Sequence, residues 1–299
     1  MRVSTRIRLM KIGVLVALLA FIFAGMHFLL PAVATWRERG RLDPHSQLVE
    51  TARLRLWAPP GTREPRRLAE ALEAFATALH AQYGDALALR PLGERITVRL
   101  FATQEAMLEQ ATRRSMTQDL SHAIGFYSPA DWSIAATLRP PGEMLPLLYH
   151  EATHLLMHRP DQPTAGRRSP WITEGVAVFF EQSDPTAAPP RVGGLSRSAA
   201  AAIAALARRG EHVALRQLVA GGDALFASDR APLAYRQAGA LVAYLLAGAD
   251  GRHRSGFLRY YREDMERGPA PVESLEYLLG VSIAELEERW LAYLQRNSG

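Results

Sequence analysis

The spacing of apolar residues changes character about halfway along the chain. In the first half it alternates over short runs, as in residues 52–57 (ARLRLW) and 95–101 (RITVRLF), which is typical of half-buried strands. Two further runs, 124–127 and 133–138, are joined by the turn-forming sequence SPAD and predict a β-hairpin. The early part of the chain is therefore expected to build a small sheet.

Helical spacing, with apolar residues every three or four positions, dominates the rest. A proline in the first turn is compatible with a helix, and so we expect helices that contain Pro146 and Pro170 near their starts, the second capped by Ser169. The predicted helices cover residues 65–83, 103–113, 146–158, 170–182, 198–209, 231–246, 252–267, 272–279 and 282–296. This order predicts an α+β protein in two lobes, a sheet lobe over 47–183 and a helical lobe over 184–299.

The N-terminus carries the longest apolar run. Four basic residues lie within residues 1–11, and residues 12–34 are free of charge, long enough to cross a bilayer as one helix. We expect a cytoplasmic tail (1–11), a transmembrane anchor (12–34) and a linker (35–46), which places the bulk of the chain outside the cytoplasm, in the periplasm or at the cell surface. A cleaved signal peptide is the alternative, because Ala32-Val33-Ala34 fits the small-residue cleavage pattern.

Composition limits the chemistry that is available. The chain has 299 residues and no cysteine, so a metal site must use imidazole and carboxylate ligands. Its 35 basic and 30 acidic residues give a formal charge of +5, and the basic residues are spread along the chain. No dense basic cluster is present, and nucleic-acid binding is not expected.

Residues 147–158 read LLYHEATHLLMH and place polar groups inside an apolar helix. His150 and His154 are four residues apart, so their imidazoles lie on one helix face, one turn apart, as a shared zinc ion requires. Glu151 lies at the flank of that face and can reach a water molecule without being a ligand. The structural alternative is an ordinary core helix; for His158 this alternative is favoured, because a histidine at a helix C-terminus meets the helix dipole favourably.

A third ligand is available in residues 170–181, which read PWITEGVAVFFE. Glu174 falls in the first two turns of the predicted helix, and Gly175 is expected to let this helix approach the histidine helix closely. Glu181, seven residues on, lies on the same face as Glu174 and is expected to orient His150 or His154 by a hydrogen bond. Two imidazoles and one carboxylate leave a coordination position open, as in catalytic zinc sites.

The sequence His-Glu-Ala-Thr-His followed by Trp-Ile-Thr-Glu-Gly-Val-Ala resembles the gluzincin zinc metallopeptidases, and within them the peptidase MA-like proteins. The resemblance implies a gluzincin-like two-lobed domain with Zn²⁺ bound by His150, His154 and Glu174. It implies that Glu151 is the general base and that Tyr235 stabilises the oxyanion. It also implies that the strand over 133–138 is the sheet edge to which a peptide substrate adds; the predicted substrate-binding residues are Ser133, Ile134, Ala135 and Ala136.

The favoured function is therefore an extracytoplasmic, membrane-tethered zinc peptidase whose partners are a peptide or protein substrate and the membrane. One alternative is a non-catalytic zinc-binding scaffold that serves as a binding or assembly module in the cell envelope. Another is a zinc hydrolase of a different bond, such as an amide in cell-wall peptide.

Overall fold

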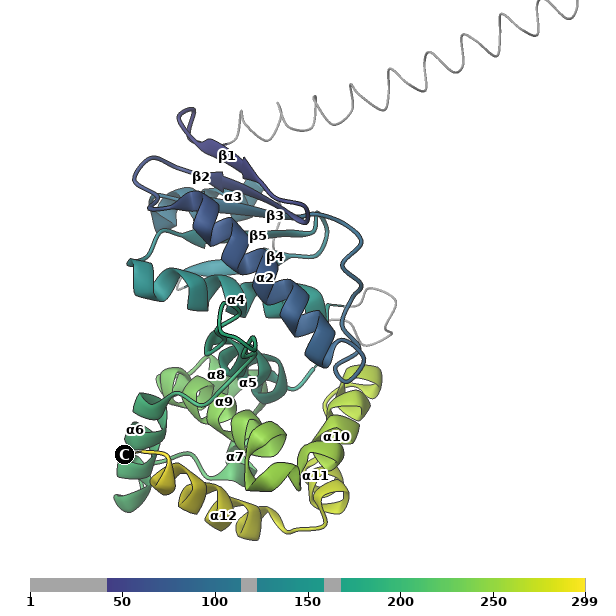
Figure 1. Cartoon of the computed structure of the whole chain (residues 1–299). Helices are drawn as coiled ribbons and strands as arrows, with labels where there is room; N and C mark the ends of the chain where they lie inside the picture. Colours follow the sequence, from purple (N-terminus) through teal and green to yellow (C-terminus); the bar gives the residue numbers. More distant parts are fainter. Residues whose placement is uncertain (1–41, 114–122, 159–167, 299) are drawn as a thin grey trace, which may run out of the picture. The chain divides into compact units, whose positions relative to one another are not determined.

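A computed structural model describes residues 42–113, 123–158 and 168–298 (Figure 1). Residues Leu48–Gly299 form one compact unit, and Met1–Gln47 form another, of which residues 42–47 are described. The predicted anchor over 12–34 lies outside the described residues. Within the described ranges, no helix combines the length and the apolar character that crossing a bilayer requires.

The first structural layer is a five-stranded mixed sheet. Its strands are β1 (Gln47–Glu50), β2 (Leu54–Ala58), β3 (Ile96–Phe101), β4 (Gly125–Ser128) and β5 (Ser133–Thr137), in the spatial order β1-β2-β3-β5-β4. β2, β3 and β5 run parallel, whereas β4 pairs with β5 as the predicted antiparallel hairpin.

Helices cover the sheet. α2 (Pro65–Tyr83) packs on β2, and α4 (Pro141–Met157) packs on β4 and β5 and against α2. α3 (Gln104–Arg113) packs on β3 and β5 and lies behind the strands in the view of Figure 1. All six residues of β3 are buried, as expected for a central strand covered on both faces.

The second half of the unit is helical. α5 (Pro170–Glu181) lies beside α4 and packs extensively on α9 (Ala231–Ala247). The remaining helices are α6 (Arg197–Arg208), α7 (Leu215–Ala220), α8 (Gly222–Phe226), the 3₁₀ turn η1 (Ala249–Gly251), α10 (Arg254–Arg267), α11 (Val272–Leu279) and α12 (Ile283–Arg296). One apolar core continues from the sheet through these helices. The α+β prediction is confirmed, whereas the lobe boundary at 183/184 stays a prediction.

The start of α4 differs from the prediction. The helix begins at Pro141, five residues before the expected Pro146, so Pro146 lies inside it. Pro141 occupies the first helical position, where its missing N–H costs nothing. Pro146 has no backbone N–H, so the carbonyl of Gly142, four residues earlier, loses its helical hydrogen bond. Gly142 is exposed, and water can solvate that carbonyl.

The prediction that the strand over 133–138 forms the sheet edge is wrong. β5 lies between β3 and β4, and Ser133, Ile134, Ala135 and Ala136 are all buried. Among the described strands, the edge on this side is β4, because β5 pairs with β3 on one side and with β4 on the other.

Ser169 stands at the N-cap position of α5, but its side chain does not cap the helix. Its hydroxyl and its backbone N–H both donate to the carboxylate of Asp264 in α10, at 2.5 and 3.0 Å. Asp264 is fully buried and also accepts from the N–H of Ala270 at 3.0 Å. The start of α5 is therefore anchored by a carboxylate of the helical half.

The close approach expected at Gly175 is real, but its partner is α9 and not α4. A Cβ added at Gly175 would lie 2.8 Å from the carbonyl oxygen of Ala238. In the opposite direction, a Cβ on Gly239 would lie 2.3 Å from Cγ1 of Val178. Because Gly175 and Gly239 have no side chains, α5 and α9 pack closely together. This contact fixes the position of α5 and therefore of Glu174.

We expect Gly175→Ala to lower the free energy of unfolding by about 1–3 kcal/mol, because the methyl group meets backbone that cannot rotate away. Gly142→Ala in the first turn of α4 is the matched control. No atom lies within 4 Å of its Cβ position, and alanine is the better helix former. Urea denaturation of both variants measures the difference; equal stabilities would contradict the proposed role of the α5–α9 contact.

Candidate metal centre

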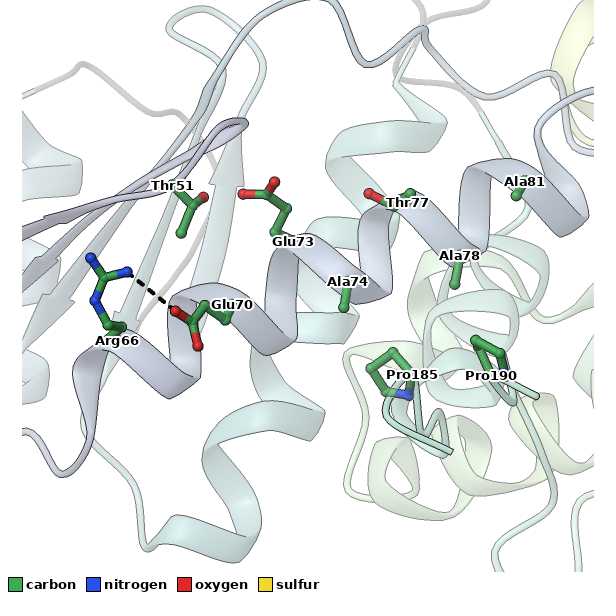
Figure 2. A pocket seen from close by; sticks show the side chains of 10 residues that line it. All are labelled: Thr51, Arg66, Glu70, Glu73, Ala74, Thr77, Ala78, Ala81, Pro185 and Pro190. Atoms are coloured by element: carbon green, nitrogen blue, oxygen red, sulfur yellow. Dashed lines mark hydrogen bonds and ion pairs between the residues drawn. The ribbon is translucent and has the colours of Figure 1, made fainter. Parts of the chain in front are cut away.

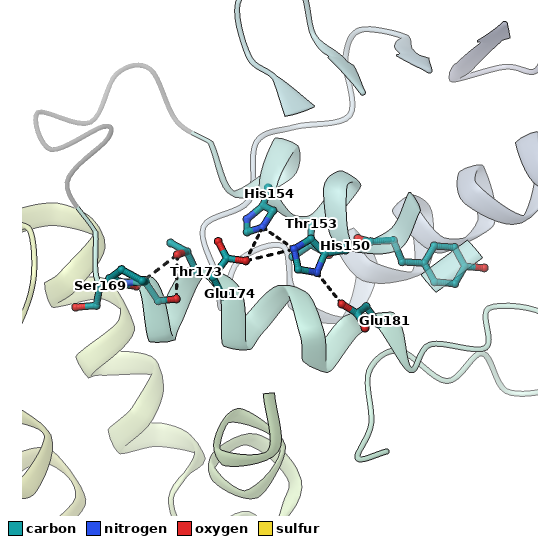
Figure 3. Close-up of polar contacts among 9 residues, drawn as sticks. His150, Thr153, His154, Ser169, Thr173, Glu174 and Glu181 are labelled. Carbon is teal, nitrogen blue, oxygen red and sulfur yellow. Dashed lines mark hydrogen bonds and ion pairs between the residues drawn. The ribbon is translucent and has the colours of Figure 1, made fainter. Parts of the chain in front are cut away.

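Two helices from different parts of the chain bring three polar side chains together (Figure 3). α4 supplies His150 and His154 one turn apart, and α5 supplies Glu174 from its second turn. The opposite face of α4 is apolar: Tyr149 is buried and stacks on Phe75 of α2, with ring centroids 4.2 Å apart. Burial of that face directs the two histidines toward α5.

The three ligand atoms form a nearly equilateral triangle. Nε2 of His150 lies 3.0 Å from Nε2 of His154, and each nitrogen lies 3.3 Å from Oε2 of Glu174. Zinc bonds to nitrogen and oxygen are about 2.0–2.1 Å, so two ligands of a tetrahedral ion stand about 3.3 Å apart. The triangle therefore has the dimensions of one face of a tetrahedral zinc site.

The proton on His150 is assigned by its second contact. Nδ1 of His150 lies 2.7 Å from Oε1 of Glu181, and because a carboxylate can only accept, Nδ1 carries the proton. A neutral His150 then presents a bare lone pair on Nε2 toward His154 and Glu174. Such an arrangement of acceptors is stabilised by a cation at its centre, either a proton or a metal ion. The predicted contact of Glu181 with the histidine pair is present.

The electrostatics of the cluster favour positive charge. Burial lowers the pKa of His150, but hydrogen bonds to Glu174 and Glu181 and the charge of Glu151 raise it well above the usual value. Burial raises the pKa of Glu174, but the charge of His154 and hydrogen bonds from both histidines outweigh this effect and bring the pKa well below its usual range. Three carboxylates surround two imidazoles, and a divalent cation would offset most of their negative charge.

Glu151 lies beside the triangle and outside it. Its side chain is 7% exposed, and none of the described residues hydrogen-bonds to its carboxylate. Burial raises the pKa of Glu151, an effect that the charges of His150 and His154 only partly offset. Its nearest wall is β4, where a Cβ added at Gly125 would lie 3.2 Å from both Cγ and Oε1 of Glu151.

An aromatic residue that the sequence interpretation had not singled out completes this wall. The ring of Tyr127 in β4 stacks on the imidazole of His154, with centroids 5.4 Å apart and planes 24° apart. Burial raises the pKa of Tyr127, with Glu174 and Glu151 adding to the effect, so its hydroxyl stays neutral. The signal in the sequence is the alternation of the strand, which puts Gly125 and Tyr127 on one face.

Two other predicted residues lie in different surroundings. Tyr235, in the first turns of α9, packs its ring on Phe226. Its pKa is raised by burial and, to a smaller extent, by the charges of Glu174 and Glu151; its role stays a prediction. His158 stands at the C-cap of α4 and is not part of the ligand triangle; its structural role stays a prediction.

A surface pocket of about 580 Å³ lies along α2, away from the histidines (Figure 2). Its carboxylates are already partnered: Glu70 pairs with Arg66 at 3.2 Å, and Glu73 accepts from the N–H of Arg53 at 3.2 Å. Its other lining residues are mostly alanine and proline, with the hydroxyl groups of Thr51 and Thr77 beside them.

No protein-family model matches the chain, and no curated protein matches it either. The geometry alone therefore identifies the class of site: two histidines and one glutamate that can hold a metal ion.

We expect His154→Ala to weaken zinc binding more than about 100-fold, because it removes one corner of the triangle. His158→Ala, one turn further along α4, is the matched control and should keep one zinc per chain. Metal analysis after dialysis against a weak chelator measures both. Retention of zinc by the first variant would show that the triangle is not the binding site.

Glu181→Gln should weaken zinc binding by about 10–100-fold. The amide oxygen can still accept the hydrogen bond from Nδ1 of His150, but it lacks the negative charge that makes the imidazole a stronger ligand. Glu143→Gln, at an exposed carboxylate in the first turn of α4, controls for the loss of one charge. Competition with a chromogenic zinc chelator gives both affinities, and equal losses would assign the effect to net charge alone.

Proposed function

We propose that this protein is a zinc metallopeptidase of the gluzincin type that hydrolyses peptide bonds outside the cytoplasm. The observation that supports this most strongly is the ligand triangle with edges of 3.0–3.3 Å and a separate buried glutamate beside it. A structural zinc site has four protein ligands, whereas three ligands and an open position are typical of catalytic zinc.

A bound zinc ion would supply Lewis-acid activation of a water molecule and of the scissile carbonyl. In this proposal Glu151 takes the proton from the water and passes it to the leaving amine. Its burial supports this role, because a raised carboxyl pKa brings a general base closer to the working pH. Tyr235, kept neutral by burial, would donate a hydrogen bond to the oxyanion.

The substrate would bind as an extended peptide along the sheet edge. Because β5 is internal, the available strand is β4, whose Gly125 and Tyr127 line the metal centre. A peptide that pairs with β4 would run past the histidines, with backbone hydrogen bonds giving affinity for many sequences. The expected anchor over residues 12–34 would hold the enzyme at the outer face of the membrane.

The position of Glu151 favours catalysis over a zinc-binding scaffold. A buried carboxylate without a described hydrogen-bond donor costs folding free energy, and a scaffold would gain nothing from it. An enzyme needs such a group next to the metal.

Glu151→Gln tests the proposal. The variant should keep about one zinc per chain, since position 151 is not in the triangle, but its kcat on a peptide library should fall at least about 100-fold. Zinc analysis and mass spectrometry of the digested library measure the two effects together.

A wild-type protein that binds zinc and cleaves nothing in the library would contradict peptidase activity and favour the scaffold. Digestion of purified cell-wall peptides alongside the library identifies a hydrolase of the other amide. Removal of the metal with a strong chelator should abolish cleavage, and added zinc should restore it.

A further inference from the structure

One strand of the sheet contacts both functional groups of the histidine helix. Gly125 and Tyr127 are two residues apart in β4, so they face the same side, toward α4. Gly125 lies against Glu151, and Tyr127 stacks on His154, three residues further along the helix. Two successive inward-facing residues of β4 thus each contact one residue of α4: Gly125 contacts Glu151, and Tyr127 contacts His154.

The contact at Tyr127 restricts the rotation of the His154 ring. His154 has to point Nε2 at the same place as His150 and Glu174, yet among the described residues only His150 has a carboxylate, Glu181, at its second nitrogen, with Nδ1 and Oε1 2.7 Å apart. The stacked phenol ring, with its plane 24° from that of the imidazole, supplies a flat surface that selects the ring orientation of His154.

The contact at Gly125 has a different cause. Its φ is not in the left-handed region, so the backbone does not require glycine. The space does: a methyl group would meet Cγ and Oε1 of Glu151 at 3.2 Å and Cδ1 of Leu147 at 3.1 Å. A side chain at position 125 would push the carboxylate of Glu151 away from the strand.

We infer that β4 is a positioning strand for the metal centre, in which the ring of Tyr127 orients His154 and the bare backbone at Gly125 admits Glu151. This inference rests on the proposed function and adds two residues to it. Neither Tyr127 nor Gly125 is a metal ligand, so each acts through the residue that it contacts, His154 or Glu151.

Tyr127 is tested by zinc affinity and by the visible absorption spectrum of the cobalt-substituted full-length protein. Tyr127→Ile keeps strand propensity but loses the aromatic face; it should weaken zinc binding about tenfold or more and change the cobalt spectrum. Tyr127→Phe keeps the ring and should restore both to wild-type values. Tyr149→Leu removes a more deeply buried tyrosine from the opposite face of α4 and should leave both unchanged.

Gly125 is tested by the division between kcat and KM. Gly125→Ala should lower kcat roughly tenfold with zinc affinity and KM unchanged, because Glu151 is the one group of the centre that the methyl would meet; the other contact, Cδ1 of Leu147, is the end of a flexible side chain. Gly142→Ala, in a helix position with open space, should change neither. Gly125→Ala keeps the inference testable if Tyr127→Ile fails to fold.

The outcomes separate the two proposals. A wild-type protein that binds no zinc or cleaves no peptide overturns the proposed function, and the inference falls with it. An active wild type whose Tyr127→Ile variant binds zinc normally, or whose Gly125→Ala variant keeps its full kcat, overturns the inference alone.

Discussion

Three potential ligand atoms, Nε2 of His150, Nε2 of His154 and Oε2 of Glu174, hold the central place in this structure. Because Nδ1 of His150 donates its proton in a hydrogen bond to Glu181, a neutral His150 turns the lone pair of Nε2 toward His154 and Glu174, at 3.0 and 3.3 Å. Without a cation, such an arrangement is repulsive in its neutral form and requires extra protons. The surrounding fold has to supply enough packing energy to keep the arrangement together.

Much of that packing lies away from the metal centre. The apolar face of α4 sits on the sheet and on α2, while α5 is held from behind by α9 through the bare backbones of Gly175 and Gly239. Asp264 anchors the residue before α5 by two hydrogen bonds. The ligand triangle therefore depends on contacts that α4 and α5 make on their far sides.

The wall formed by β4 shows how stability and function compete. A carboxylate with a raised pKa, buried against a glycine, lowers stability, and in the proposed function it stands next to the open coordination position. The same strand is the edge of the sheet among the described residues, so the surface proposed to receive the peptide is continuous with the centre.

Periodicity was a good guide wherever the local chain decided the structure. The helices α2 and α11 match their predicted ranges to the residue, and the hairpin forms as expected, because their apolar spacing and flanking glycine or proline agree. The start of α4 was missed because Pro146 was given the role that Pro141 has. The short helices α7 and α8 were missed because six and five residues carry too little periodicity to be recognised.

The sequence by itself determined which side chains could meet a metal ion, since the four-residue spacing on one helix and a glutamate at the start of the next helix are local properties. It could not determine which strand borders the centre, which helix faces Gly175, or that Gly125 and Tyr127 touch Glu151 and His154. Those contacts join segments whose order in space depends on the closing of the sheet and on the packing of α9. Only the tertiary structure decides them, because the free energy that selects one arrangement comes from burial shared among distant segments.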